Sequence, residues 1–67
     1  MKNSIRVERA IKDMTQAALS EEMGVSRQTI NAIEASKYVP SAVLVLKIAK
    51  YFNKPVEAIF ELEESDF

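Results

Sequence analysis

The sequence contains no cysteine and no histidine, and its 67 residues include one glycine and two prolines. Without cysteine the chain forms no disulfide, no cysteine-ligated zinc site and no thiol-dependent active site. Without histidine it lacks the side chain that most often transfers protons near neutral pH. A hydrophobic fraction of 48% is typical of a folded chain rather than a disordered one. The length predicts one small domain, residues 1–67, with a modest core.

The net charge of −1 argues, taken alone, against binding to nucleic acid. The charge is divided unevenly, however. Residues 1–55 contain nine Lys or Arg and five Asp or Glu, whereas residues 56–67 contain five acids and no base. The negative charge therefore belongs mainly to the C-terminal segment, including an acidic tail at 61–67, and the rest of the chain is moderately basic.

The spacing of apolar residues predicts five helices, at residues 4–12, 16–23, 27–35, 42–52 and 56–60. Thr15, Ser26 and Ser41 stand at helix starts, where their hydroxyls can accept a free backbone N–H. Gly24 ends the second helix, since glycine enters the left-handed conformation without steric cost. Alternation at 60–62 indicates a short strand, so the expected all-α domain can include a terminal β-ribbon.

Two of these helices have notable apolar faces. The face expected to be buried in the first helix consists of Val7, Ala10, Ile11 and Met14. The fourth helix is apolar nearly all round. Such a helix is either central in its own domain or shared with a partner, and the sequence leaves both alternatives open.

Residues 16–35 have the pattern of a helix-turn-helix, in which two short helices flank a tight turn. At about 100° per residue, Ile30 and Ile33 point to the core. The opposite side of the second helix then carries Arg27, Gln28 and Asn31. Arg can form paired hydrogen bonds with guanine, and Gln or Asn with adenine. A merely solvated face is the alternative, but such faces favour Lys and Glu, which are scarce here.

The same residues resemble the small single-domain Cro/cI-type (XRE-type) helix-turn-helix regulators, a group that includes the cytolysin repressor. The most specific part is the run Val-Ser-Arg-Gln-Thr-Ile at 25–30, with Lys-Tyr at 37–38 and Pro-Ser at 40–41 downstream. The resemblance covers nearly the whole chain. It implies a lambda-repressor-like fold of five helices and sequence-specific regulation of transcription, above all repression. The implied partner is double-stranded DNA, bound through the major groove, and no cofactor or metal ion is expected.

The resemblance also implies roles for individual residues. Gln16 would bind a phosphate and brace Arg27, the first recognition residue, while Arg27, Gln28 and Asn31 would contact base edges. The backbone of the DNA would be contacted by polar side chains near the two ends of the recognition helix, namely Ser26, Thr29, Lys37, Tyr38 and Ser41. Arg9 would pair with Glu34, which lies partly toward the core, and would position the recognition helix.

Three positions depart from the family pattern. Ser20 stands where Ala is usual, at the close crossing of two helices, and serine is small enough to fit there. Ser36 stands after the recognition helix, where Gly or Asn is usual. Because serine is strained in the left-handed conformation, this helix can end in another way, which leaves the placement of Lys37 open. Glu8 occupies a position that is often apolar in relatives, and Val7 and Ile11 are expected to supply the buried face instead.

Two interpretations remain open for Phe60 and Leu62 in the C-terminal segment. They either complete the domain's own core or form the interface of a homodimer, which the resemblance favours. A dimer would place two recognition helices about 34 Å apart, which is one turn of DNA. A further alternative is binding of an unidentified protein partner through this segment, as in an antitoxin that represses its own operon and neutralises a toxin.

An enzyme is not expected, and no catalytic residue is proposed. The chain has no Gly-rich phosphate loop, and its adjacent carboxylates Glu21 and Glu22 point in different directions on a helix. The first residues lead into no long apolar run, so a cytoplasmic protein without membrane contact is expected.

Overall fold

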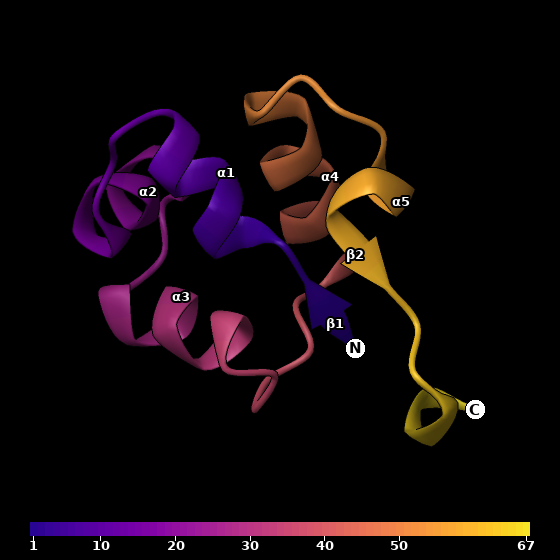
Figure 1. Cartoon of the computed structure of the whole chain (residues 1–67). Helices are drawn as coiled ribbons and strands as arrows, with labels where there is room; N and C mark the ends of the chain where they lie inside the picture. The colour runs from indigo at the N-terminus through magenta and orange to yellow at the C-terminus, as the bar shows by residue number, and fades with distance from the viewer.

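The computed structural model describes all 67 residues. It shows a helical domain in which the two ends of the chain pair as a short β-ribbon (Figure 1). The helices are α1 (Ile5–Ile11), α2 (Gln16–Met23), α3 (Arg27–Glu34), α4 (Ala42–Tyr51) and α5 (Val56–Ile59). Strands β1 (Lys2–Asn3) and β2 (Phe60–Glu61) pair antiparallel, with Asn3 opposite Phe60, and the 3-10 turn η1 (Glu64–Asp66) follows. The five-helix architecture with a terminal ribbon is confirmed, whereas β1 and η1 are additions to the sequence-based expectation.

The helix starts follow from the local sequence. The side-chain hydroxyls of Thr15, Ser26 and Ser41 accept the backbone N–H three residues further on, at 3.0, 3.1 and 3.2 Å. Each cap of this kind contributes about 1 kcal/mol to stability. Gly24 has φ of 71°, the left-handed conformation that ends α2 and begins the tight turn to α3.

One core joins all five helices and β2. It consists of eleven buried apolar side chains, namely Ile5, Leu19, Met23, Ile30, Ile33, Leu44, Ile48, Ala49, Phe52, Ile59 and Phe60. The α2–α3 pair lies on one side of α1 and the α4–α5 pair on the other (Figure 1). Because α3 contributes Ile30 and Ile33 to this core, its opposite side is left for solvent.

The buried face of α1 differs from the expected one. Ile5 and Glu8 are buried, whereas Val7 and Ile11 are 56% and 70% exposed. The reason lies far along the chain, because Lys54 Nζ is 2.7 Å from a carboxylate oxygen of Glu8. This ion pair satisfies a charged group at a position otherwise suited to an apolar side chain. The expectation that Val7 and Ile11 replace Glu8 in the core is therefore wrong.

Helix α1 also ends before the expected face is complete. Asp13 adopts the left-handed conformation, with φ of 53°. The N–H groups of Asp13 and Met14 donate to the carbonyls of Ala10 and Arg9 at 3.1 and 3.0 Å and so close the helix. Met14 lies beyond the helix and packs, half-buried, at the edge of the core.

Helix α3 ends in a left-handed residue, Ser36, in the same way as it would if Gly or Asn stood at this position. Ser36 has φ of 59°, and its N–H donates to the carbonyl of Ile33 at 3.0 Å. The N–H of Lys37 reaches the carbonyl of Ala32 at 2.9 Å, which completes the C-terminal cap. Ser36 Oγ also donates to the carbonyl of Met1 at 3.1 Å, which helps to hold this strained residue in place. The expectation of a different helix end is wrong, and Lys37 follows the cap directly.

Helix α4 fits both interpretations of its apolar sequence. Leu44, Ile48 and Ala49 are buried, whereas Val43 and Leu46 are 68% and 60% exposed. One side of α4 is thus central in the domain, and the other presents apolar side chains to solvent.

The C-terminal segment is attached to the N-terminus. The Met1 ammonium lies 3.1 Å from Glu63 Oε1 and 3.0 Å from Asp66 Oδ2. The hydrogen bond to Asp66, and after it the one to Glu63, raises the pKa of the Met1 ammonium. The backbone N–H of Glu63, followed by the Met1 ammonium, lowers the pKa of Asp66. Two of the tail's acids therefore face the N-terminus rather than the outer side of α3.

Candidate DNA-binding surface

Helices α2 and α3 form the rigid base of the candidate site. Leu19 and Met23 of α2 are buried against Ile30 and Ile33 of α3 in the common core. Ser20 is buried as well, and its Oγ donates to the carbonyl of Ala17 at 2.7 Å, so the hydroxyl leaves no unpaired polar group at the crossing. The geometry holds α3 firmly on one side and leaves the other side free.

The free side of α3 carries the side chains expected there. Arg27, Gln28 and Asn31 are all exposed, and Ala32 between them is half-buried. At the start of the helix Ser26 Oγ and Thr29 Oγ1 lie 2.9 Å apart in a mutual hydrogen bond. Arginine and amide groups at the start of an exposed helix are suited to contact base edges.

The loop after α3 places further polar groups beside this face. Lys37, Tyr38 and Ser41 are all exposed. Thr29, Tyr38 and Ser41 line one groove between the turn after α2 and the start of α4. The Ser41 hydroxyl already caps α4, so it is fixed in direction at the rim of that groove. These groups have the chemistry and exposure of phosphate ligands.

Lys47, a residue that the sequence analysis did not single out, borders the same groove. Its Nζ donates to the carbonyl of Met23 at 2.7 Å, at the C-terminal end of α2. This bond fixes α4 to the helix-turn-helix, since a lysine there satisfies a carbonyl that the helix leaves free. The partner is 24 residues away in the sequence, so no local signal identifies it.

A polar network lies behind the free side of α3. Arg9 Nε and Nη2 donate to the two carboxylate oxygens of Glu34 at 2.7 and 2.9 Å, and Arg9 Nη1 donates to the carbonyl of Met14 at 2.9 Å. The Glu34 carboxylate raises the pKa of Arg9 above its already high value. The ion pair expected between these helices is present, with Arg9 and Glu34 side chains only 14% and 7% exposed.

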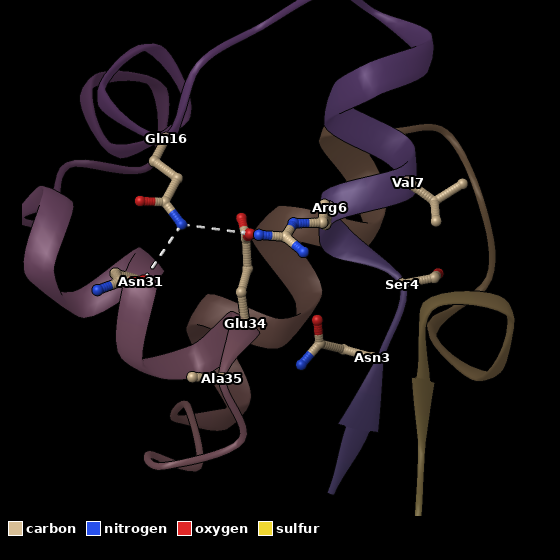
Figure 2. Close-up of a pocket in the computed structure, with 8 residues that line it drawn as sticks. All are labelled: Asn3, Ser4, Arg6, Val7, Gln16, Asn31, Glu34 and Ala35. Atoms are coloured by element: carbon tan, nitrogen blue, oxygen red, sulfur yellow. Dashed lines mark hydrogen bonds between the residues drawn. The ribbon is translucent and has the colours of Figure 1, made fainter.

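Gln16 occupies a different place in this network from the one expected. Its Nε2 donates to Glu34 Oε1 at 3.3 Å and to Asn31 Oδ1 at 3.4 Å, as Figure 2 shows. Arg27 lines a shallow hollow together with Gln16, but no hydrogen bond joins the two side chains. In this structure Gln16 braces Asn31 rather than the first residue of α3.

Asn3 is a second residue that sequence reasoning missed. Its Nδ2 donates at 2.8 Å to the carbonyl of Ile33, which also accepts from the N–H of Ser36, and so it ties the N-terminal segment to the C-terminal end of α3. The bond depends on pairing between β1 and β2, which joins the two ends of the chain. No pattern near Asn3 could have indicated it.

Phe60 and Leu62, the two apolar residues considered for a dimer interface, differ in burial. Phe60 is 6% exposed and belongs to the core of its own chain. The expectation that Phe60 lies in a dimer interface is therefore corrected. Its aromatic side chain is held there by β2, which pairs with β1. Leu62 lies just after the strand and is 61% exposed.

The fold and the site together define a helix-turn-helix protein, in which a polar helix face is held outward by a second helix. A family model described as helix-turn-helix matches residues 5–59, and the chain belongs to this family of DNA-binding transcriptional regulators. No helix in the structure has the length and hydrophobicity of a membrane-spanning segment.

Three relatives from archaea and bacteria are named as uncharacterised HTH-type transcriptional regulators. The one from Methanocaldococcus jannaschii is 48% identical, over 98% of this chain and 100% of its own length. The one from Bacillus subtilis is 47% identical over the same shares of the two chains. One from Archaeoglobus fulgidus is 42% identical, over 98% of this chain and 93% of its own length.

Proposed function

We propose that this chain is a sequence-specific repressor that binds an inverted-repeat operator as a homodimer, with α3 in the major groove. It would be a small single-domain regulator of the kind to which the cytolysin repressor belongs, acting on DNA in the cytoplasm. The observation that carries the proposal is the outer side of α3. Three polar side chains, Arg27, Gln28 and Asn31, are exposed there, whereas Glu34, the one acid of this helix, is only 7% exposed and is paired with Arg9.

Base and phosphate contacts are assigned to different parts of this surface. Arg27, Gln28 and Asn31 contact base edges, where their hydrogen-bonding groups distinguish base pairs. The phosphate contacts fall to side chains on either side of α3, namely Ser26, Thr29, Lys37, Tyr38 and Ser41. The resemblance places Gln16 among them, but its Nε2 donates to Glu34 and Asn31, so we assign it a positioning role instead. Arg9 and Glu34 contact no DNA, and they set the position of α3 from behind.

Dimerisation is supported by the exposed apolar side chains. Val43 and Leu46 on α4, and Leu62 after β2, are each about two-thirds exposed, at 68%, 60% and 61%. Side chains of this kind favour burial against a second surface. A single domain of this size offers few contacts to DNA, and two linked half-sites add affinity through effective concentration.

A protein partner is the second candidate, as for an antitoxin. Leu62 and Phe67 are 61% and 93% exposed in an otherwise acidic segment. This combination suits a partner with an apolar groove and a basic rim. Pull-down with the product of a neighbouring gene tests it, and binding that Leu62→Ser abolishes would favour this candidate.

Selection of bound sequences from a random DNA pool tests the main proposal. We expect an inverted repeat with half-site centres about ten base pairs apart. Arg27→Ala is then expected to lose preference for the selected site. Lys50→Ala is the matched control, because Lys50 is exposed at the opposite end of α4 from Ser41. Enrichment of no sequence, or equal loss in both variants, would contradict the proposal.

A further inference from the structure

The inference concerns Asn31, and it rests on the proposed function. Asn31 is exposed on the outer side of α3, where we assign it a base contact. An asparagine amide has one acceptor oxygen and one donor nitrogen, and it can turn either toward the DNA. Which atom faces outward therefore decides which bases it accepts.

The orientation of this amide is set by a chain of hydrogen bonds that begins at Glu34. A carboxylate only accepts hydrogen bonds, and both oxygens of Glu34 are held by Arg9 at 2.7 and 2.9 Å. The Gln16 side chain approaches Glu34 Oε1 at 3.3 Å, so the atom that faces Glu34 must be the donor Nε2. The direction of the Gln16 amide is thus determined by chemistry as well as by position.

The same nitrogen of Gln16 determines the direction of Asn31. Its second proton points to Asn31 at 3.4 Å, so Asn31 must offer the acceptor Oδ1 toward Gln16. Asn31 Nδ2 is then directed away from Gln16 and Glu34, as Figure 2 shows. The outward group of Asn31 is a hydrogen-bond donor.

We propose that Gln16 is a positioning residue that makes Asn31 a hydrogen-bond donor to DNA, so that Asn31 selects guanine over adenine. Guanine presents two acceptors in the major groove, O6 and N7, whereas adenine presents the N7 acceptor beside the N6 donor. The paired contact of asparagine with adenine needs Oδ1 to accept from N6. Here Oδ1 faces Gln16, and Nδ2 meets a second donor at adenine but an acceptor at guanine.

The test compares base preferences in sequence selection and in binding to the selected duplex. The base pair read by Asn31 is first identified as the one whose preference is lost in Asn31→Ala. At that base pair the wild-type protein is expected to bind guanine about tenfold more tightly than adenine. In Gln16→Met, which keeps the length but removes the donor, the ratio is expected to fall to about twofold or less.

A matched control and a second substitution separate orientation from general weakening. Glu21→Met introduces the same side chain at an exposed position of α2 whose side chain bonds to neither Asn31 nor Glu34, and it should leave the guanine preference at Asn31's base pair intact. Asn31→Asp presents an acceptor in place of the donor, and the preferred base should change from guanine to cytosine, whose N4 is a donor. This result does not depend on the folding of Gln16→Met.

The outcomes distinguish this inference from the proposed function. If the wild-type protein selects no DNA sequence, the proposed function itself fails. If it selects a site but prefers adenine at Asn31's base pair, the orientation argument is overturned. An unchanged tenfold preference in a folded Gln16→Met protein, or no base pair affected by Asn31→Ala, would overturn it equally.

Discussion

The ion pair between Arg9 and Glu34 gives the sharpest test of how α3 is held. Arg9→Met leaves the Glu34 carboxylate, which is 7% exposed, with one long bond from Gln16. Glu34→Met leaves the Arg9 guanidinium, which is 14% exposed, with the carbonyl of Met14 alone. Loss of one partner from a buried pair costs roughly 3–5 kcal/mol, and the slight exposure favours the lower end, about 3 kcal/mol.

The double variant is expected to be much more stable than either single one. Arg9→Met with Glu34→Met removes both charges and leaves two apolar side chains of similar length in the same place. Replacement of a buried ion pair by apolar residues is often close to neutral, so a loss of about 1 kcal/mol or less is expected. In a domain of this size, each single variant would lower Tm by roughly 12–24 °C, and the double variant by a few degrees.

Thermal and urea unfolding followed by circular dichroism measure these differences at one fixed protein concentration. The concentration must be matched because dimerisation would make Tm depend on it. Two results would refute the reasoning. Single variants within 1 kcal/mol of the wild type would mean that the pair does not hold α3, and a double variant that loses the sum of both would mean that no unpaired charge is involved.

Three further predictions follow from the same structure. Glu8→Leu should raise Tm by about 5 °C, because it replaces a buried carboxylate whose lysine partner can return to solvent, and a lower Tm would contradict this. Lys37→Ala should weaken binding to all DNA sequences and reduce the salt slope by roughly one unit, and an unchanged slope would argue against a phosphate contact. The contacts among Met1, Glu63 and Asp66 should stabilise the fold between roughly pH 4 and pH 8. The contribution of Asp66, whose pKa is lowered, is lost as the pH falls through that value, and that of Met1, whose pKa is raised, is lost as the pH rises through it. Asp66→Asn should flatten this profile in pH-dependent unfolding, and identical profiles would exclude the contacts as its source.

The parts of the fold that depend on neighbouring residues could be predicted from the sequence. Caps at Thr15, Ser26 and Ser41 and the turn at Gly24 act within a few residues, so each helix of the site begins where expected. The outward direction of Asn31 and of the other polar residues of α3 follows from helical geometry and the apolar Ile pair.

The parts that depend on distant residues could not be predicted in this way. Glu8 is buried because Lys54 reaches it across 46 positions, and no local pattern contains that distance. The same holds for Asn3, which reaches Ile33 only after β1 has paired with β2. Gln16 stands at the start of α2, and its Nε2 donates to Asn31 and Glu34 of α3. Only the three-dimensional structure distinguishes this bracing of Asn31 from the bracing of Arg27 that the resemblance implies.

The most direct test of the account is a titration of the isotope-labelled protein with its selected duplex, followed by amide NMR signals. We expect the largest shifts at the start of α2, along α3 and in residues 37–41. The amide signals at the C-terminal end of α4 and in η1 should change least. Largest shifts in the C-terminal segment, with α3 unaffected at saturating DNA, would contradict the claim that α3 reads the DNA.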